Sequence, residues 1–136
     1  MESVSSVGVL DKAVAVIRAI EQVGPQTLLE LQHFTGLPRA TLHRLAVALE
    51  AHGLLRREES GRFCLGLSLA ALGAIAADSF PIASIARPHL LTLVRATGES
   101  VQLYVREGER RRCAVSLPSP KGLRWIAAEG SLLPLL

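Results

Sequence analysis

Cysteine, histidine and aromatic residues are scarce in this chain of 136 residues, and their scarcity excludes several classes of protein. The two cysteines, Cys64 and Cys113, lie far apart without a CxxC spacing, so no disulfide framework is predicted and a reducing, cytoplasmic location is expected. The four histidines never fall at metal-ligand spacing with each other or with a cysteine, so no metal ion is expected. With five aromatic residues in all, Trp125 is expected in a core or an interface rather than on a base-stacking platform.

Sequence signatures of cofactors, catalysis and secretion are also missing. No GxGxxG pattern, P-loop or nucleophile elbow occurs, so no cofactor is predicted and the chain is not expected to be an enzyme. The first six residues lack the basic and apolar regions of a signal peptide. The longest uncharged run inside the chain, residues 63–77, is too short to span a bilayer, and no membrane partner is expected.

Positive charge is unevenly placed along the chain. The net charge is +3 and the sequence pI is about 9.4, while 49% of the residues are hydrophobic, which is enough for a folded core. Residues 1–80 carry seven Lys and Arg against eight Asp and Glu, whereas residues 81–136 carry eight against four. Overall basicity therefore does not by itself predict that the first half binds nucleic acid. Between residues 38 and 62, however, five arginines outnumber three glutamates.

The hydrophobic periodicity of the first half predicts three short helices followed by a hairpin. Gly24 and Pro25 end the first helix. Thr27, with Glu30 three residues later, predicts a capping box at the start of the second. Pro38 suits the first position of the third helix, where its missing N–H costs nothing. The predicted elements are helices at residues 9–23, 27–34 and 38–52 and strands at residues 54–57 and 62–65, which is the order of a winged helix-turn-helix.

The second half is predicted to be an α+β unit that follows an apolar helix. That helix, residues 66–77, is apolar nearly all round and suits either the central core helix of one domain or a linker packed against a second copy. The linker is preferred, because a three-helix module is already complete without it. A further helix is predicted at residues 81–97 and strands at 101–105, 113–117 and 123–127. The predicted domains are a winged helix-turn-helix domain at 1–66, a linker and dimerisation helix at 67–80, and a partial domain at 81–136.

Side chains that suit the edges of bases lie on the exposed side of the predicted third helix. Arg39 can bridge guanine O6 and N7, and Thr41 and His43 can reach bases or phosphates. Ala40 allows close approach to a thymine methyl. The residues expected to position the protein on phosphates or in the minor groove are Thr27, Arg44, Arg57 and Arg62.

Two of these assignments have alternatives. Arg44 can instead pair with Glu30 or Glu50 and brace the helices without touching DNA. The whole winged helix can instead serve as a protein-interaction module that scaffolds an oligomer without reading a DNA sequence. A steep salt dependence of duplex binding distinguishes a DNA reader from such a scaffold.

Several stretches of the chain carry a family resemblance. Residues 36–45 read Gly-Leu-Pro-x-x-Thr-x-x-Arg-Leu, and residues 62–66 read Arg-x-x-Leu-Gly. Arg87-Pro88-His89-Leu90 and Thr97-Gly98-Glu99-Ser100-Val101 continue the pattern. Together these stretches resemble the IclR family of bacterial transcriptional regulators.

The resemblance implies a fold and a function. The implied fold is a winged helix-turn-helix, a dimerising helical linker and a truncated GAF-like α/β effector-binding domain. The implied function is that of a repressor or activator that binds a promoter operator as a homodimer or tetramer under the control of a small organic acid. Family members are usually longer than this chain, so no effector-binding residue is assigned. The linker residues expected in the dimer interface are Leu67, Leu69, Leu72 and Ile75.

Overall fold

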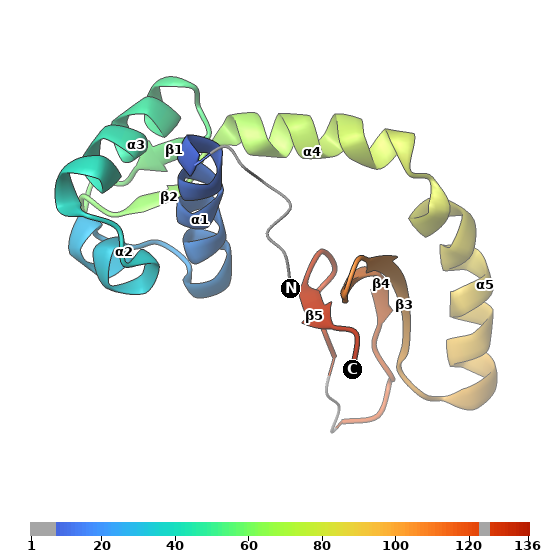
Figure 1. Cartoon of the computed structure of the whole chain (residues 1–136). Coiled ribbons are helices and arrows are strands. Elements are labelled where there is room, and N and C mark those ends of the chain that lie inside the picture. Colours follow the sequence, from blue (N-terminus) through green and yellow to red (C-terminus); the bar gives the residue numbers. More distant parts are fainter. Residues whose placement is uncertain (1–7, 123–125) are drawn as a thin grey trace. The chain divides into compact units, whose positions relative to one another are not determined.

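A computed structural model describes residues 8–122 and 126–136 of the chain, which divides into two compact units, 1–76 and 77–136 (Figure 1). The predicted fold class, a winged helix-turn-helix followed by a small unit of helix and sheet, is confirmed. The elements in chain order are α1 (Gly8–Val23), α2 (Leu28–Thr35), α3 (Arg39–Ala51), β1 (Leu55–Arg57), β2 (Phe63–Leu65), α4 (Leu67–Ser79), α5 (Ile82–Thr97), β3 (Val101–Glu107), β4 (Arg110–Leu117) and β5 (Leu132–Pro134).

One hydrophobic core holds the first unit together. Leu31 of α2 and Leu42 of α3 are fully buried, and burying a leucine side chain contributes about 1.5–3 kcal/mol. Each of the first three helices buries one face, as the spacing of their apolar residues predicts. The buried residues of this core are Val16, Ala19, Ile20, Leu31, Leu42, Ala46, Leu49, Leu55 and Phe63.

The wing is a short antiparallel sheet that a third segment joins. β1 pairs with β2, with Leu55 opposite Leu65 and Arg57 opposite Phe63. Gln26, in the loop before α2, adds to the other side of β2, because its backbone N–H donates to Phe63 O (3.0 Å) and the Phe63 N–H donates back (2.7 Å). The buried Gln26 side chain donates from Nε2 to Ala19 O (2.8 Å), so the wing is tied to the end of α1.

In the second unit, α5 contacts an antiparallel sheet of order β3-β4-β5. The third strand is not where the sequence predicted it. Ile126 and Ala127 belong to no strand, and residues 123–125 lie outside the described residues. β5 instead pairs with the first residues of β4, because the chain turns at Gly130 (φ 87°) and the Gly130 N–H donates to Cys113 O (2.8 Å).

Few features of the described residues suit membrane, metal or thiol chemistry. No single helix there is long and apolar enough to cross a bilayer, although α4 and α5 taken together reach the required length and hydropathy. Within residues 8–122 and 126–136, no group of three His, Cys, Asp or Glu side chains gathers as metal ligands do. Cys64 and Cys113 are buried free thiols, and desolvation raises the pKa of both, so neither is an activated nucleophile.

Candidate nucleic-acid interface

Backbone caps fix the turn between α2 and α3. Thr27 Oγ1 accepts a hydrogen bond from the Glu30 N–H (3.2 Å), and the Glu30 carboxylate accepts one from the Thr27 N–H (2.8 Å), which confirms the predicted capping box. At the other end of α2, Gly36 adopts φ 70°, a left-handed conformation that favours glycine, and its N–H donates to Gln32 O (2.9 Å). These caps set where α3 begins, as a recognition helix requires.

The third helix has one buried face and one exposed face. Its buried residues, Leu42, Ala46 and Leu49, lie in the core. Thr41 is half-buried at the boundary between the two faces. The structure leaves the predicted base-reading residues outside the core, with Ala40 and His43 on the exposed side of α3 and Arg39 at its first position. The exposed residues among them are Arg39, Ala40 and His43, and Arg44 lies on the same side.

A groove beside α3 is lined in part by Lys12, a residue that the sequence analysis did not single out. Thr41 and Arg44 line it from α3, and Lys12 lines it from the start of α1. The groove has a volume of about 470 Å³, and its other lining residues are Gly8, Val9 and Leu45. The helical period places Lys12 one turn before the buried Val16, on the side of α1 that faces the core. Only the packing of α1 against α3 brings that amine beside the recognition helix.

The bracing alternative predicted for Arg44 is not observed. Glu30 pairs instead with Arg62 (2.9 Å), and Glu50 lies 3.8 Å from Arg57 Nε. Among the described residues, Arg44 forms no ion pair, and its side chain is exposed beside the groove. Its guanidinium therefore remains available to a ligand.

Arg57 projects from β1 of the wing. Its guanidinium carbon lies 4.5 Å from the centre of the Phe63 ring, a cation–π contact across the pair of strands. Phe63 is only 2% exposed, so the ring is a fixed support, whereas the Arg57 side chain is exposed. The stacked guanidinium lies at the surface, and its contact with Glu50, at 3.8 Å, is too long for a strong hydrogen bond.

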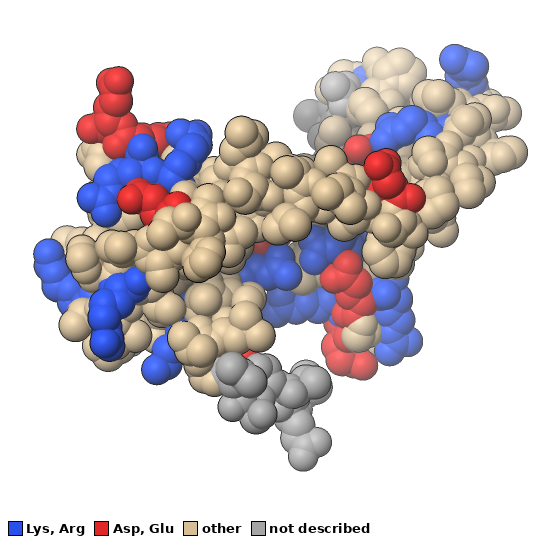
Figure 2. Space-filling view, turned by 90° about the horizontal axis from the view of Figure 1, so that it is seen from above, with Lys and Arg blue, Asp and Glu red and all other residues tan. Residues whose placement is uncertain are grey.

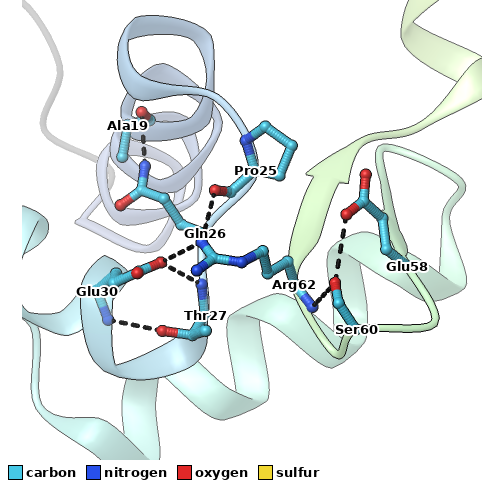
Figure 3. Close-up of polar contacts among 8 residues, drawn as sticks. All are labelled: Ala19, Pro25, Gln26, Thr27, Glu30, Glu58, Ser60 and Arg62. Carbon is cyan, nitrogen blue, oxygen red and sulfur yellow. Dashed lines mark hydrogen bonds and ion pairs between the residues drawn. The ribbon is translucent and has the colours of Figure 1, made fainter.

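Arg62, on the opposite side of the wing turn, is engaged within the protein (Figure 3). Its Nη1 donates to Glu30 Oε2 (2.9 Å) and to Pro25 O (3.2 Å), so it links the wing to the start of α2. The sequence predicted the same role for Arg57 and Arg62, that of positioning the protein on phosphates or in the minor groove. The structure gives them different surroundings.

The exposed side chains of α4 are largely apolar. No residue of this helix is buried, and Leu67, Leu72 and Ile75 are 81%, 57% and 68% exposed. Figure 2 shows its surface in tan, with hardly a charged residue along it. Residues three apart lie close together on a helix, so Leu69, Leu72 and Ile75 form one stripe, and Leu67 lies at the edge of it on the side of Ile75. An exposed stripe of this kind is typical of a surface that another protein chain covers.

Comparison with known proteins decides the family. Residues 9–59 match the IclR helix-turn-helix domain. Over 124 residues the chain is 33% identical to the HTH-type transcriptional regulator KipR of Bacillus subtilis, covering 91% of this chain and 50% of KipR. The chain belongs to the IclR family. It is also 26% identical over 128 residues to the transcriptional repressor AllR of Escherichia coli, covering 93% of this chain and 47% of AllR.

Solved structures of IclR proteins share this fold. An IclR transcriptional regulator from Alicyclobacillus acidocaldarius aligns with a TM-score of 0.77 at 26% identity, covering 96% of this chain and 54% of that one. An IclR homolog from Microbacterium hydrocarbonoxydans, solved in complex with 4-hydroxybenzoate, aligns with a TM-score of 0.79 at 24% identity, covering 93% and 53%. The chain thus spans about half the length of the IclR proteins that it matches.

Acid is expected to weaken the IclR domain through Glu30. The Thr27 N–H, helped by the nearby Arg62 charge, lowers the pKa of this carboxyl from its usual value of 4.5. A carboxyl whose pKa is lower in the folded state stabilises the fold above its unfolded pKa, and the contribution is lost as pH falls through the folded value. We expect the free energy of unfolding of the first unit to fall as pH drops below about 4.5, and the fall to be shallower in Glu30→Gln.

The measurement needs a probe that reports on the first unit of this IclR chain. Its single Trp and single Tyr both lie after residue 76, so fluorescence follows the other unit. Amide hydrogen exchange of the buried Leu31, compared at pH 6 and in acid, reports on the first unit directly. Equal acid sensitivity in wild type and Glu30→Gln would contradict the assignment of this effect to Glu30.

Proposed function

We propose that this chain reads a promoter operator as a dimer, with α3 in the major groove of each half-site. The observation that supports this is the set of donor-bearing and small side chains on the exposed side of a capped, well-packed α3. The proposed base-reading residues are Arg39, Ala40, Thr41 and His43. The proposed phosphate-contacting residues are Lys12, Arg44 and Arg57, with Thr27 near the phosphates at the start of α2.

The proposed dimer forms through α4, in the proposed linker segment 67–80 between a reading domain at 1–66 and a partial effector domain at 81–136. The stripe of Leu69, Leu72 and Ile75 supports this assignment, because Leu72 and Ile75 are exposed and Leu69 is half-buried. Two copies so joined present two recognition helices, and these fit one face of a duplex when the half-sites lie about 34 Å apart. Assembly into a tetramer would extend the same arrangement.

The proposed effector of the whole protein is a small organic acid, and control would act by changing the separation of the two recognition helices. One IclR homolog of the same fold binds 4-hydroxybenzoate in its crystal, which is an acid of this class. We propose that the protein acts in the cytoplasm on chromosomal DNA, as a repressor or an activator.

Fluorescence anisotropy with a random duplex pool tests the proposed function. The pool is selected for binding, and the selected duplex is then titrated at several salt concentrations. A dimer that neutralises six to eight phosphates gives a log–log slope of about −5 to −7, and selection returns a two-fold-related site. A flat titration without an enriched site would favour the alternative function, an interaction module that does not read DNA.

Thr41→Ala is expected to weaken binding of the selected duplex by about 1–3 kcal/mol while changing binding of a random duplex little. The reason is that a base contact carries sequence preference, whereas a phosphate contact does not. Thr41→Ser is the matched control, because it keeps the hydroxyl and should retain most of the preference. Parallel titrations of both duplexes measure the effect. Equal losses on both duplexes would indicate that Thr41 contacts a phosphate and does not read a base.

A further inference from the structure

Arg62 holds four connections around the wing turn (Figure 3). Its guanidinium donates to Glu30 Oε2 (2.9 Å) and to Pro25 O (3.2 Å). Its backbone O accepts from the Glu58 N–H (2.9 Å), and its own N–H donates to Ser60 Oγ (3.4 Å). One residue therefore closes the turn of the wing and ties the wing to the start of α2.

The partner carboxylate is itself held in place. Glu30 Oε2 accepts from the Thr27 N–H (2.8 Å) as well as from Arg62, and the Glu30 N–H is bound by Thr27 Oγ1. The capping box thus fixes the acceptor before Arg62 reaches it, which lowers the entropy lost when the pair forms.

The chain continues directly from Arg62 to the support of Arg57. Phe63 follows Arg62, exchanges two backbone hydrogen bonds with Gln26, and lies opposite Arg57 in the sheet. The Arg57 guanidinium stacks on the Phe63 ring. Without the Arg62 tie, the Gln26 hydrogen bonds and the burial of Phe63 are left to hold this part of the wing, so Phe63, and with it Arg57, keeps its position less well.

From these contacts we infer that Arg62 is a positioning residue, which holds the wing so that Arg57 meets a phosphate, and that it does not itself bind DNA. If Arg62 left Glu30 for a phosphate, it would uncover a carboxylate next to a second negative charge. Arg57 has no comparable tie, since its contact with Glu50 is 3.8 Å long. The inference rests on the proposed function and assigns distinct roles to the two arginines of the wing.

Arg62→Met, Glu30→Gln and Arg57→Met distinguish these roles in the full chain. Arg62→Met is expected to weaken binding of the selected and the random duplex alike, about two- to fivefold, because Arg57 then meets its phosphate less often. Glu30→Gln should weaken both to the same extent, and the double variant should weaken them little further. An Arg62 that bound a phosphate itself would instead bind duplex more tightly once the Glu30 charge was removed. Arg57→Met should reduce the magnitude of the slope of log affinity against log salt by about one, and Arg62→Met should have little further effect in that background.

Amide exchange in the absence of DNA gives an independent measurement. Arg62→Met should speed exchange of the Gln26 and Phe63 amides about two- to fivefold while leaving the Leu42 amide of α3 unchanged. Tighter duplex binding in Glu30→Gln, an undiminished loss from Arg62→Met in the Arg57→Met background, or unchanged exchange at Phe63 would overturn the inference. Failure of the wild-type chain to select any duplex would instead count against the proposed function, and the exchange measurement would still decide the role of Arg62.

Discussion

Replacing Leu72 with glutamate is expected to separate the proposed dimer and to weaken binding of the selected duplex at least a hundredfold. Leu72 lies at the centre of the α4 stripe and is 57% exposed in a single copy. In a two-fold interface each substitution acts twice, so losing the burial of this exposed part alone costs about 2–3 kcal/mol of association. Burying two glutamates near each other adds a further penalty. A monomer that holds only one half-site then loses the gain from binding two sites at once.

Sedimentation and operator titration of the same samples measure both effects. Ala74→Glu is the matched control, because Ala74 is also an exposed residue of α4 but lies two positions on, nearly opposite Leu72 on the helix. Leu72→Glu should yield monomers and Ala74→Glu should not. If Ala74→Glu separates the chains and Leu72→Glu does not, the dimer uses another face of α4 and the stripe of Leu69, Leu72 and Ile75 is the wrong assignment.

The helices of the first unit were predictable because their signals are local. The capping box of Thr27 and Glu30 and the turn at Gly36 lie within a few residues of the features that they explain. The apolar spacing of α3 predicted which of its faces is buried. The exposure of Ala40 and His43 followed from that spacing, whereas Arg39 is exposed because it stands at the first position of α3.

Contacts between residues far apart in the sequence could not be predicted from such local signals. Glu30 and Arg62 are 32 positions apart, and nothing in the local sequence of either residue singles out the other. The strand β5 was not predicted, for a related reason. The sequence placed a third strand at 123–127, whereas β5 follows from a turn at Gly130 that brings the next residues to the edge of β4. Register and partners across loops depend on the whole fold.

Gly66→Ala is expected to destabilise the first unit by about 3 kcal/mol, the upper end of the usual cost of adding a methylene where there is no room. A Cβ on Gly66 would lie 2.0 Å from Gly53 O and 2.9 Å from the Leu54 carbonyl carbon, both backbone atoms. The Gly66 N–H donates to Leu54 O (2.9 Å), so the two segments cannot separate without losing a buried hydrogen bond. Ser68, in the first turn of α4, also donates its N–H to Gly53 O (3.2 Å).

Gly73→Ala is the matched control, and it should have the opposite sign. Gly73 lies inside α4 and does not have a positive φ. A Cβ added there would have no other atom within 4 Å. Alanine there should stabilise α4 by about 0.5–1 kcal/mol, because glycine loses more conformational freedom on folding. Thermal unfolding followed by far-ultraviolet circular dichroism compares the two, and at roughly 4 °C or more per kcal/mol the difference is well resolved.

If Gly66→Ala unfolds at the wild-type temperature, the junction between α3 and α4 can deform at low cost. In that case α4 cannot transmit a change in its own direction to the recognition helix, and control of helix separation through the linker loses its physical basis.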